Sequence, residues 1–218
     1  MFAVLDWING PFVTLGTEAI ALPSVLGALA FLVCEGAAAR GARWVWSVGA
    51  IAALVLAALA LVDGRWVDSG IRIVVAALCA YGWRHRRSQA MAVRFATGRE
   101  MAYGVVLFAI ATVVVAYALT AQTEDSVSWG GAVVVAALFV QLAALARGLV
   151  TGWWVVLAGA VVSLGLAAAS GSWAGAIVSA AAGALAVYGW VQWRRDARAS
   201  EVLDFPIADE IVDEDLVA

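Results

Sequence analysis

The sequence has no lysine, one histidine, two cysteines and three prolines among its 218 residues. Charged residues make up 13% of the chain, whereas a soluble domain has about 25%. Hydrophobic residues make up 65%, and the mean hydropathy is +0.95. A soluble domain of this size exposes too much surface to hide so many apolar side chains. The composition therefore excludes a soluble enzyme, a nucleic-acid-binding protein and a disordered chain, and it indicates an integral membrane protein.

The scarcity of cysteine and histidine also limits the chemistry that the chain can perform. Cys34 and Cys79 both lie in apolar runs, which disfavours a disulfide framework or a thiolate metal site. The single histidine, His85, lies among arginines, where a solvated loop is expected. An intramembrane enzyme would need grouped histidines or carboxylates. We therefore expect no catalytic residues, no metal and no cofactor.

The apolar residues form seven long runs. A bilayer core of about 30 Å requires roughly 20 apolar residues per helix. The runs are continuous in Ala, Val, Leu and Gly and do not alternate as barrel strands do. The sequence thus predicts an all-α membrane protein with seven transmembrane helices, which cover residues 20–36, 45–62, 67–83, 101–120, 128–146, 152–168 and 173–193.

The arginines predict the orientation in the membrane. Eleven of the thirteen follow spans one, three, five and seven or lie in the basic loop 84–100, and only Arg65 and Arg72 do not. The positive-inside rule then places the N-terminal segment 1–19 outside the cell membrane and the C-terminus in the cytoplasm. Residues 199–218 contain seven acidic residues and no basic one, so we expect a disordered, solvated cytoplasmic tail.

The chain also contains an internal repeat. A shift of 107 residues aligns residues 46–83 with 153–190 without a gap, and all three tryptophans of the first window then meet tryptophans of the second. Two three-helix units, 20–83 and 128–193, are thus joined by a linker helix at 101–120. This 3+1+3 parallel repeat is typical of transporters, which bind their substrate between the repeats.

The residues that the repeat shares also resemble a known family. Trp44-Val45-Trp46-Ser47-Val48-Gly49, Trp66-Val67-Asp68 and Tyr81-Gly82-Trp83 resemble the PnuC family of bacterial B-vitamin transporters. Gly152-Trp153-Trp154 and the run from Tyr188 to Trp193 resemble the other half of the family pattern. Leu5-Asp6-Trp7-Ile8-Asn9 resembles its actinobacterial riboflavin-transporting branch.

The resemblance implies uptake of nicotinamide riboside or a related vitamin by facilitated diffusion, with the cargo trapped by a cytoplasmic kinase. The sequence departs from the family pattern at Arg72, where the family has Gln, at Ser47, where it has Pro, and near Ala160, where an Asn is expected. Two amides that could bind a nicotinamide or a ribose are therefore absent. Riboflavin transport is the alternative, and thiamine and nucleosides stay open.

Flat aromatic side chains are the expected stacking surface for a ring-bearing cargo. We expect Trp46, Trp153 and Trp154 to bind the substrate, because Trp46 and Trp153 are related by the repeat. The alternative for each is an aromatic belt that anchors a helix at the membrane surface.

Polar residues inside the spans are the other candidates. Arg72 lies about 9 Å into its helix. It either faces a cavity as a functional group or pairs with Asp68 one turn earlier. Gln141 is an intramembrane amide that either contacts the cargo or bridges two helices. We expect no embedded carboxylate other than Asp68, which disfavours ion-coupled transport.

The expected partners are a vitamin or nucleoside-like small molecule and the lipid bilayer, with no nucleic acid; homo-oligomerisation is left open. A membrane receptor or scaffold that signals through the acidic tail is a further alternative to a transporter.

Overall fold

The computed structural model describes residues 11–15, 18–88, 93–123 and 129–203. Within these ranges the chain forms seven helices, as predicted. They are α2 (Leu22–Ala39), α3 (Trp44–Val62), α4 (Trp66–Ser88), α5 (Gly98–Thr123), α6 (Trp129–Ala146), α7 (Gly152–Ser170) and α8 (Trp173–Leu203). Five of them, α3, α5, α6, α7 and α8, are long and apolar enough to cross a membrane. Because Asp68 and Arg72 lie in the first two turns of α4, that helix is less apolar than these five.

Two segments differ from the sequence prediction. An antiparallel hairpin of β1 (Pro11–Leu15) and β2 (Glu18–Ala21) precedes the first helix, and Ile20 and Ala21, predicted to begin the first span, are therefore in a strand. Helix α8 continues to Leu203, so the first five residues of the expected disordered tail are helical. Ala, Arg and Glu are good helix formers, which lets a helix continue past the apolar span. Residues 204–218 and the Leu5–Asn9 motif lie outside the described residues.

The outer surface of the bundle is apolar. Val62, Val105 and Val161 are 82%, 68% and 62% exposed, and many other large hydrophobic side chains are also exposed. Such a surface is stable only in contact with lipid or another protein. The interior is built mainly of alanines, whose small side chains let helices approach closely.

The turns repeat with the offset found in the sequence. Gly41, Gly64, Gly148 and Gly171 all have φ near +71°, a left-handed conformation that favours glycine. Gly41 and Gly148 follow α2 and α6, and Gly64 and Gly171 follow α3 and α7, each pair 107 residues apart. The two three-helix units therefore share their turn geometry as well as their tryptophans.

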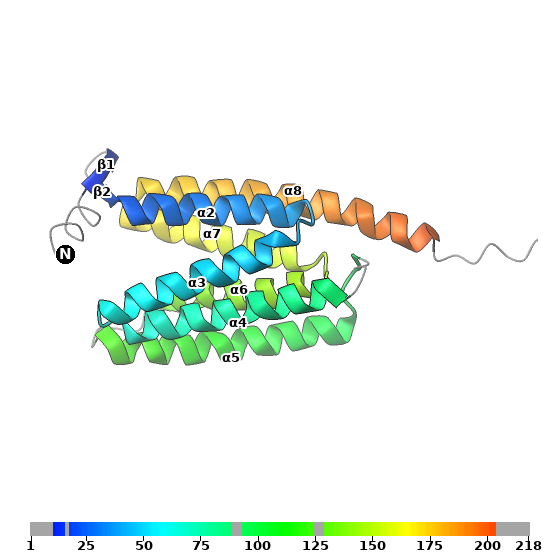
Figure 1. The fold of residues 1–218 in the computed structure, drawn as a ribbon, viewed down its shortest axis with the longest axis horizontal. Coiled ribbons are helices and arrows are strands. Elements are labelled where there is room, and N and C mark those ends of the chain that lie inside the picture. The colour runs from blue at the N-terminus through cyan, green and yellow to red at the C-terminus, as the bar shows by residue number, and fades with distance from the viewer. Residues whose placement is uncertain (1–10, 16–17, 89–92, 124–128, 204–218) are drawn as a thin grey trace, which may run out of the picture.

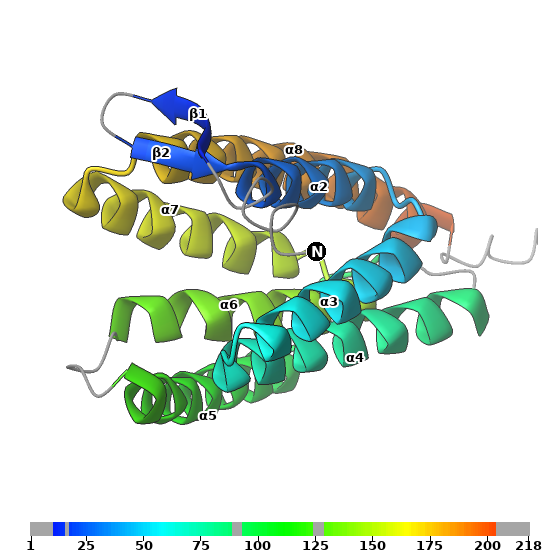
Figure 2. The same ribbon diagram turned by 60° about the vertical axis from the view of Figure 1, so that its left-hand side comes forward.

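The first helix of each unit packs against the third helix of the other unit. Helix α2 lies beside α8, and α6 lies beside α4, as Figures 1 and 2 show. Helix α2 makes few contacts with α3, the next helix of its own unit, whereas α6 packs closely on α7. This difference between the two units separates α2 from α3 and leaves space between them.

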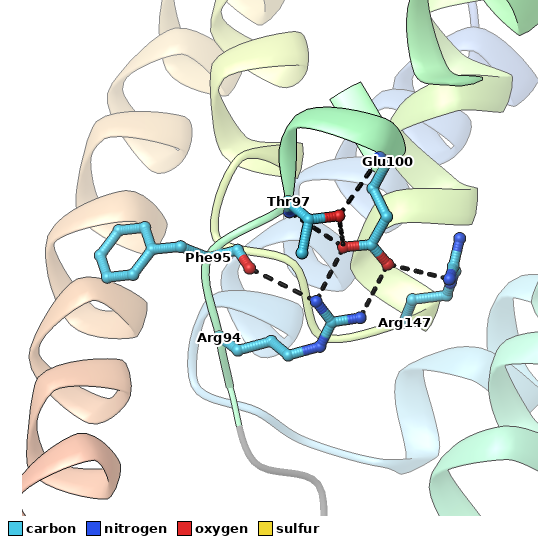
Figure 3. Close-up of polar contacts among 5 residues, drawn as sticks. All are labelled: Arg94, Phe95, Thr97, Glu100 and Arg147. Carbon is cyan, nitrogen blue, oxygen red and sulfur yellow. Dashed lines mark hydrogen bonds and ion pairs between the residues drawn. The ribbon is translucent and has the colours of Figure 1, made fainter. Parts of the chain in front are cut away.

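Helix α5 joins the units in sequence but lies at the edge of the bundle, mainly against α6 (Figure 1). Its start is a capping box, in which the Thr97 N–H donates to Glu100 Oε2 and the Glu100 N–H donates to Thr97 Oγ1. Figure 3 shows that the Glu100 carboxylate also pairs with Arg94 at 2.7 Å and with Arg147 of the α6–α7 turn at 2.9 Å. The hydrogen bonds to Glu100 raise the pKa of Arg94. This cluster ties the start of α5 to the turn between α6 and α7.

Candidate functional site

A cavity of about 400 Å³ lies between the first unit and α6. Its walls come from α2, α3, α4 and α6, and most of its lining side chains are apolar. Four lining residues carry a charge or an amide: Glu35, Asp68, Arg72 and Gln141. The volume falls in the range of small-molecule sites, which are about 300–1,000 Å³. The separation of α2 from α3 thus produces a partly open pocket of ligand size among these helices.

Trp46 lines the cavity at the end where the α2–α3 and α6–α7 turns lie. We call this end the arginine end, because Arg40, Arg43 and Arg147 lie in these turns. Its indole lies against Gly82 of α4, so close that a Cβ at Gly82 would come within 2.6 Å of the ring atom Cζ3. Trp46 is 4% exposed and belongs to a buried cluster with Leu145, Val150 and other apolar residues. This cluster closes the cavity at the arginine end.

Glu35 and Gln141 form a buried polar pair beside Trp46. Gln141 Nε2 donates a hydrogen bond of 2.7 Å to Glu35 Oε1, and the two residues are 6% and 5% exposed. The expectation that Asp68 is the single embedded carboxylate is therefore wrong. The first span was predicted to end at residue 36, which would place Glu35 at the membrane surface. The helix continues to Ala39, which places Glu35 about one turn inside and against α6.

Asp68 and Arg72 line the cavity toward its other end. Asp68 does not pair with Arg72, because its Oδ2 accepts a 2.9 Å hydrogen bond from Arg65 Nη1 in the α3–α4 turn. Arg65 also pairs with Asp63. Among the described residues Arg72 makes no ion pair, so its guanidinium is an available donor group at the cavity wall.

Trp153 and Trp154 do not line this cavity. Trp153 repeats the packing of Trp46, because its ring lies against Gly189, the counterpart of Gly82. It is fully buried, and its ring packs edge-on against Trp193, whose Nε1 donates to the Ala39 carbonyl.

Trp154 is 53% exposed and lies 5.3 Å from the ring of Trp190. It borders a second cavity, of about 560 Å³, between α5, α6 and α7. Of the six predicted site residues, four therefore meet at one cavity and two lie elsewhere.

A family model described as nicotinamide mononucleotide transporter matches residues 22–195. The riboflavin/roseoflavin transporter RibM of Streptomyces davaonensis is 29% identical over 208 residues, which cover 89% of this chain and 96% of that protein. The crystal structure of the vitamin B3 transporter PnuC matches with a TM-score of 0.62 at 13% identity and covers 80% of this chain and 81% of that chain. This structural likeness concerns the fold.

Proposed function

Because the chain belongs to the nicotinamide mononucleotide transporter family, we propose that it carries riboflavin or a close flavin across the membrane through the cavity beside Trp46. The observation that carries this proposal is the cavity itself. It combines apolar walls, an indole ring at one end and a few polar groups, which is what a ring-bearing cargo needs when it leaves water.

Riboflavin is the preferred cargo for two reasons. The relative that matches over nearly its whole length is named as a riboflavin/roseoflavin transporter. The positions where the resemblance leads us to expect two amides are occupied by Arg72 and approximately by Ala160, so a site for nicotinamide and ribose is incomplete. In this arrangement the isoalloxazine ring lies at the arginine end beside Trp46, and the hydroxyl-bearing side chain extends toward Arg72.

Nicotinamide riboside is the second candidate. The family model bears the name of a nicotinamide nucleotide, and the cavity contains the carboxyl group of Glu35. The pyridinium ring of nicotinamide riboside is a cation, which a nearby carboxylate would stabilise.

We expect transport by facilitated diffusion, with the cargo trapped by phosphorylation inside the cell. Asp68 already pairs with Arg65. The resemblance to the family implies this passive mode, whereas Glu35, the lining carboxyl group without a cationic partner in the described chain, is the group that a proton-coupled cycle would use. Riboflavin uptake should be unchanged by a protonophore, and a loss of uptake under that treatment would contradict passive transport.

The proposed site is tested by replacing Trp46. Trp46→Ala should weaken riboflavin binding by about 1–3 kcal/mol, because a buried aromatic contact with the ring is lost. Trp44→Ala is the matched control, since Trp44 is in the same turn but is 47% exposed and does not line the cavity.

The measurements are quenching of riboflavin fluorescence by the purified protein and riboflavin uptake by an auxotrophic host. Nicotinamide riboside serves as competitor in both. Normal uptake by a well-expressed Trp46→Ala variant would show that the cavity is not the site. Direct uptake of nicotinamide riboside without any riboflavin binding would favour the second candidate.

A further inference from the structure

The Glu35–Gln141 pair joins the first helices of the two units across the end of the cavity. Glu35 lies on α2 and Gln141 on α6, and their single hydrogen bond is 2.7 Å long. Each of these helices packs on the third helix of the other unit, so the pair lies where the two units meet. A group at this position can contact a cargo that is held between the units.

The pair leaves hydrogen-bonding capacity unused. Glu35 Oε2 is buried and has no hydrogen-bond partner. An amide nitrogen carries two N–H groups, and one N–H of Gln141 Nε2 is sufficient for the bond to Oε1. Buried polar groups are nearly always paired, and an unpaired one is costly. A pair that served only to hold α2 against α6 would not require this unused acceptor.

The unused groups form one acceptor next to one donor. Both residues line the same cavity as Trp46, which is 4% exposed. The complementary ligand is a ring that carries an N–H next to a carbonyl. The imide edge of a flavin and the carboxamide of a nicotinamide both have this arrangement.

Building on the proposed function, we propose that Glu35 and Gln141 are the specificity-determining residues that recognise the amide-type edge of the cargo ring. Glu35 accepts a hydrogen bond from the ring N–H, and Gln141 donates one to the adjacent carbonyl. The hydrogen bond between the two side chains holds the Glu35 acceptor next to the Gln141 donor. Discrimination then depends on the cargo's N–H, because a ligand without it leaves Glu35 Oε2 unpaired.

The experiment compares riboflavin with N3-methylriboflavin, in which a methyl group replaces the imide N–H. Binding to the purified full-length protein is measured by flavin fluorescence. The unsubstituted protein should bind riboflavin at least about tenfold more tightly, because one hydrogen bond to a charged or buried group is lost with the analogue. This comparison requires no variant and so cannot fail through misfolding.

Variants then assign the preference to Glu35. Glu35→Ala should lower the affinity for riboflavin and reduce the preference to within about twofold, since N3-methylriboflavin does not use that oxygen. Gln141→Ala should weaken both ligands, because both keep the carbonyl. Val33→Ala, on the same helix but 59% exposed and not lining the cavity, is the matched control and should keep the full preference.

The outcomes separate this inference from the proposed function. Equal binding of both flavins by the unsubstituted protein, or a preference that survives Glu35→Ala, overturns the subsite while riboflavin transport stands. If nicotinamide riboside binds and riboflavin does not, the same subsite should reject nicotinic acid riboside, whose carboxylate lacks the N–H, and equal binding of these two ligands overturns it. If neither vitamin binds, the proposed function and the subsite both fall.

Discussion

At the scale of single residues, two glycines decide where two tryptophans lie. The rings of Trp46 and Trp153 lie where a Cβ at Gly82 or Gly189 would be. The pairs are separated by the repeat offset, so the contact occurs once in each unit. Trp46 nevertheless borders the cavity, whereas Trp153 is enclosed by Trp193 and its neighbours. Trp46 and Trp153 are equivalent in the repeat but have different surroundings, because α2 makes few contacts with α3 whereas α6 packs closely on α7.

Gly82→Ala tests this contact. The added methyl group would lie 2.6–2.7 Å from Trp46 ring atoms, and the buried cluster leaves the ring little room to move. Overpacking of this kind costs about 1–3 kcal/mol, so we expect a lower melting temperature in detergent and weaker riboflavin binding. Gly70→Ala on the same helix is the control, since nothing lies within 4 Å of its added Cβ. Identical melting of the two variants would contradict the packing described for Trp46.

At the scale of helices, the ends are determined by a few polar groups. Ser172 Oγ accepts a 3.1 Å hydrogen bond from the Gly175 N–H at the start of α8. The start of α5 combines the Thr97–Glu100 capping box with ion pairs to Arg94 and Arg147. Because Arg147 belongs to the α6–α7 turn, the α5 cap also connects the linker helix to the second unit.

Substitutions in α5 test this connection. Thr97→Ala should lower stability by about 1 kcal/mol through loss of the cap. Glu100→Gln should lower it as well, and by less at high salt, because Arg94 and Arg147 are 45% and 46% exposed and salt screens their attraction. Thr112→Ala is the control on the same helix, since Thr112 Oγ1 bonds back to the Phe108 carbonyl within the helix. Thermal unfolding in detergent at two salt concentrations measures all three variants, and a loss at Thr112 equal to that at Thr97 would contradict the role of the cap.

At the scale of the whole molecule, the helices alternate in direction and gather the arginines at one end. Arginines lie in or next to the α2–α3 turn, the end of α4, the start of α5, the α6–α7 turn and the end of α8. They are Arg40, Arg43, Arg84, Arg94, Arg99, Arg147, Arg194, Arg195 and Arg198. Arg65 lies in the α3–α4 turn at the opposite end. This separation of charge is the basis of the orientation that we predict, with the arginine end in the cytoplasm.

Reporter fusions test the orientation. Green fluorescent protein fused after Leu203 should fluoresce, and alkaline phosphatase at the same point should be inactive, because the end of α8 is expected in the cytoplasm. These fusions remove residues 204–218, and riboflavin uptake should persist in them if the acidic tail does not take part in transport. An active phosphatase fusion would reverse the orientation, and lost uptake despite normal membrane expression would favour a role for the tail.

The sequence by itself determined the class, the helices and the family. Continuous apolar runs predict spans because a chain in lipid must satisfy its backbone within each helix, and in the described part of the chain each predicted span coincides with a helix except at residues 20 and 21, which belong to β2. The tryptophan and glycine spacing predicted the repeat, and the matching turns follow the same offset. The predicted resemblance to the PnuC family is confirmed by the family model over residues 22–195.

The tertiary structure alone decided where the cavity lies and which residues line it. Sequence symmetry placed Trp46 and Trp153 together at a central site. Instead, α2 packs on α8 and makes few contacts with α3, which leaves space beside Trp46. Helix α6 packs closely on α7, and Trp153 is enclosed. Glu35 was missed because its importance depends on the last turn of α2 and on Gln141, which is 106 residues away. Local patterns report burial and helix period, whereas contacts between distant helices depend on how the whole bundle packs.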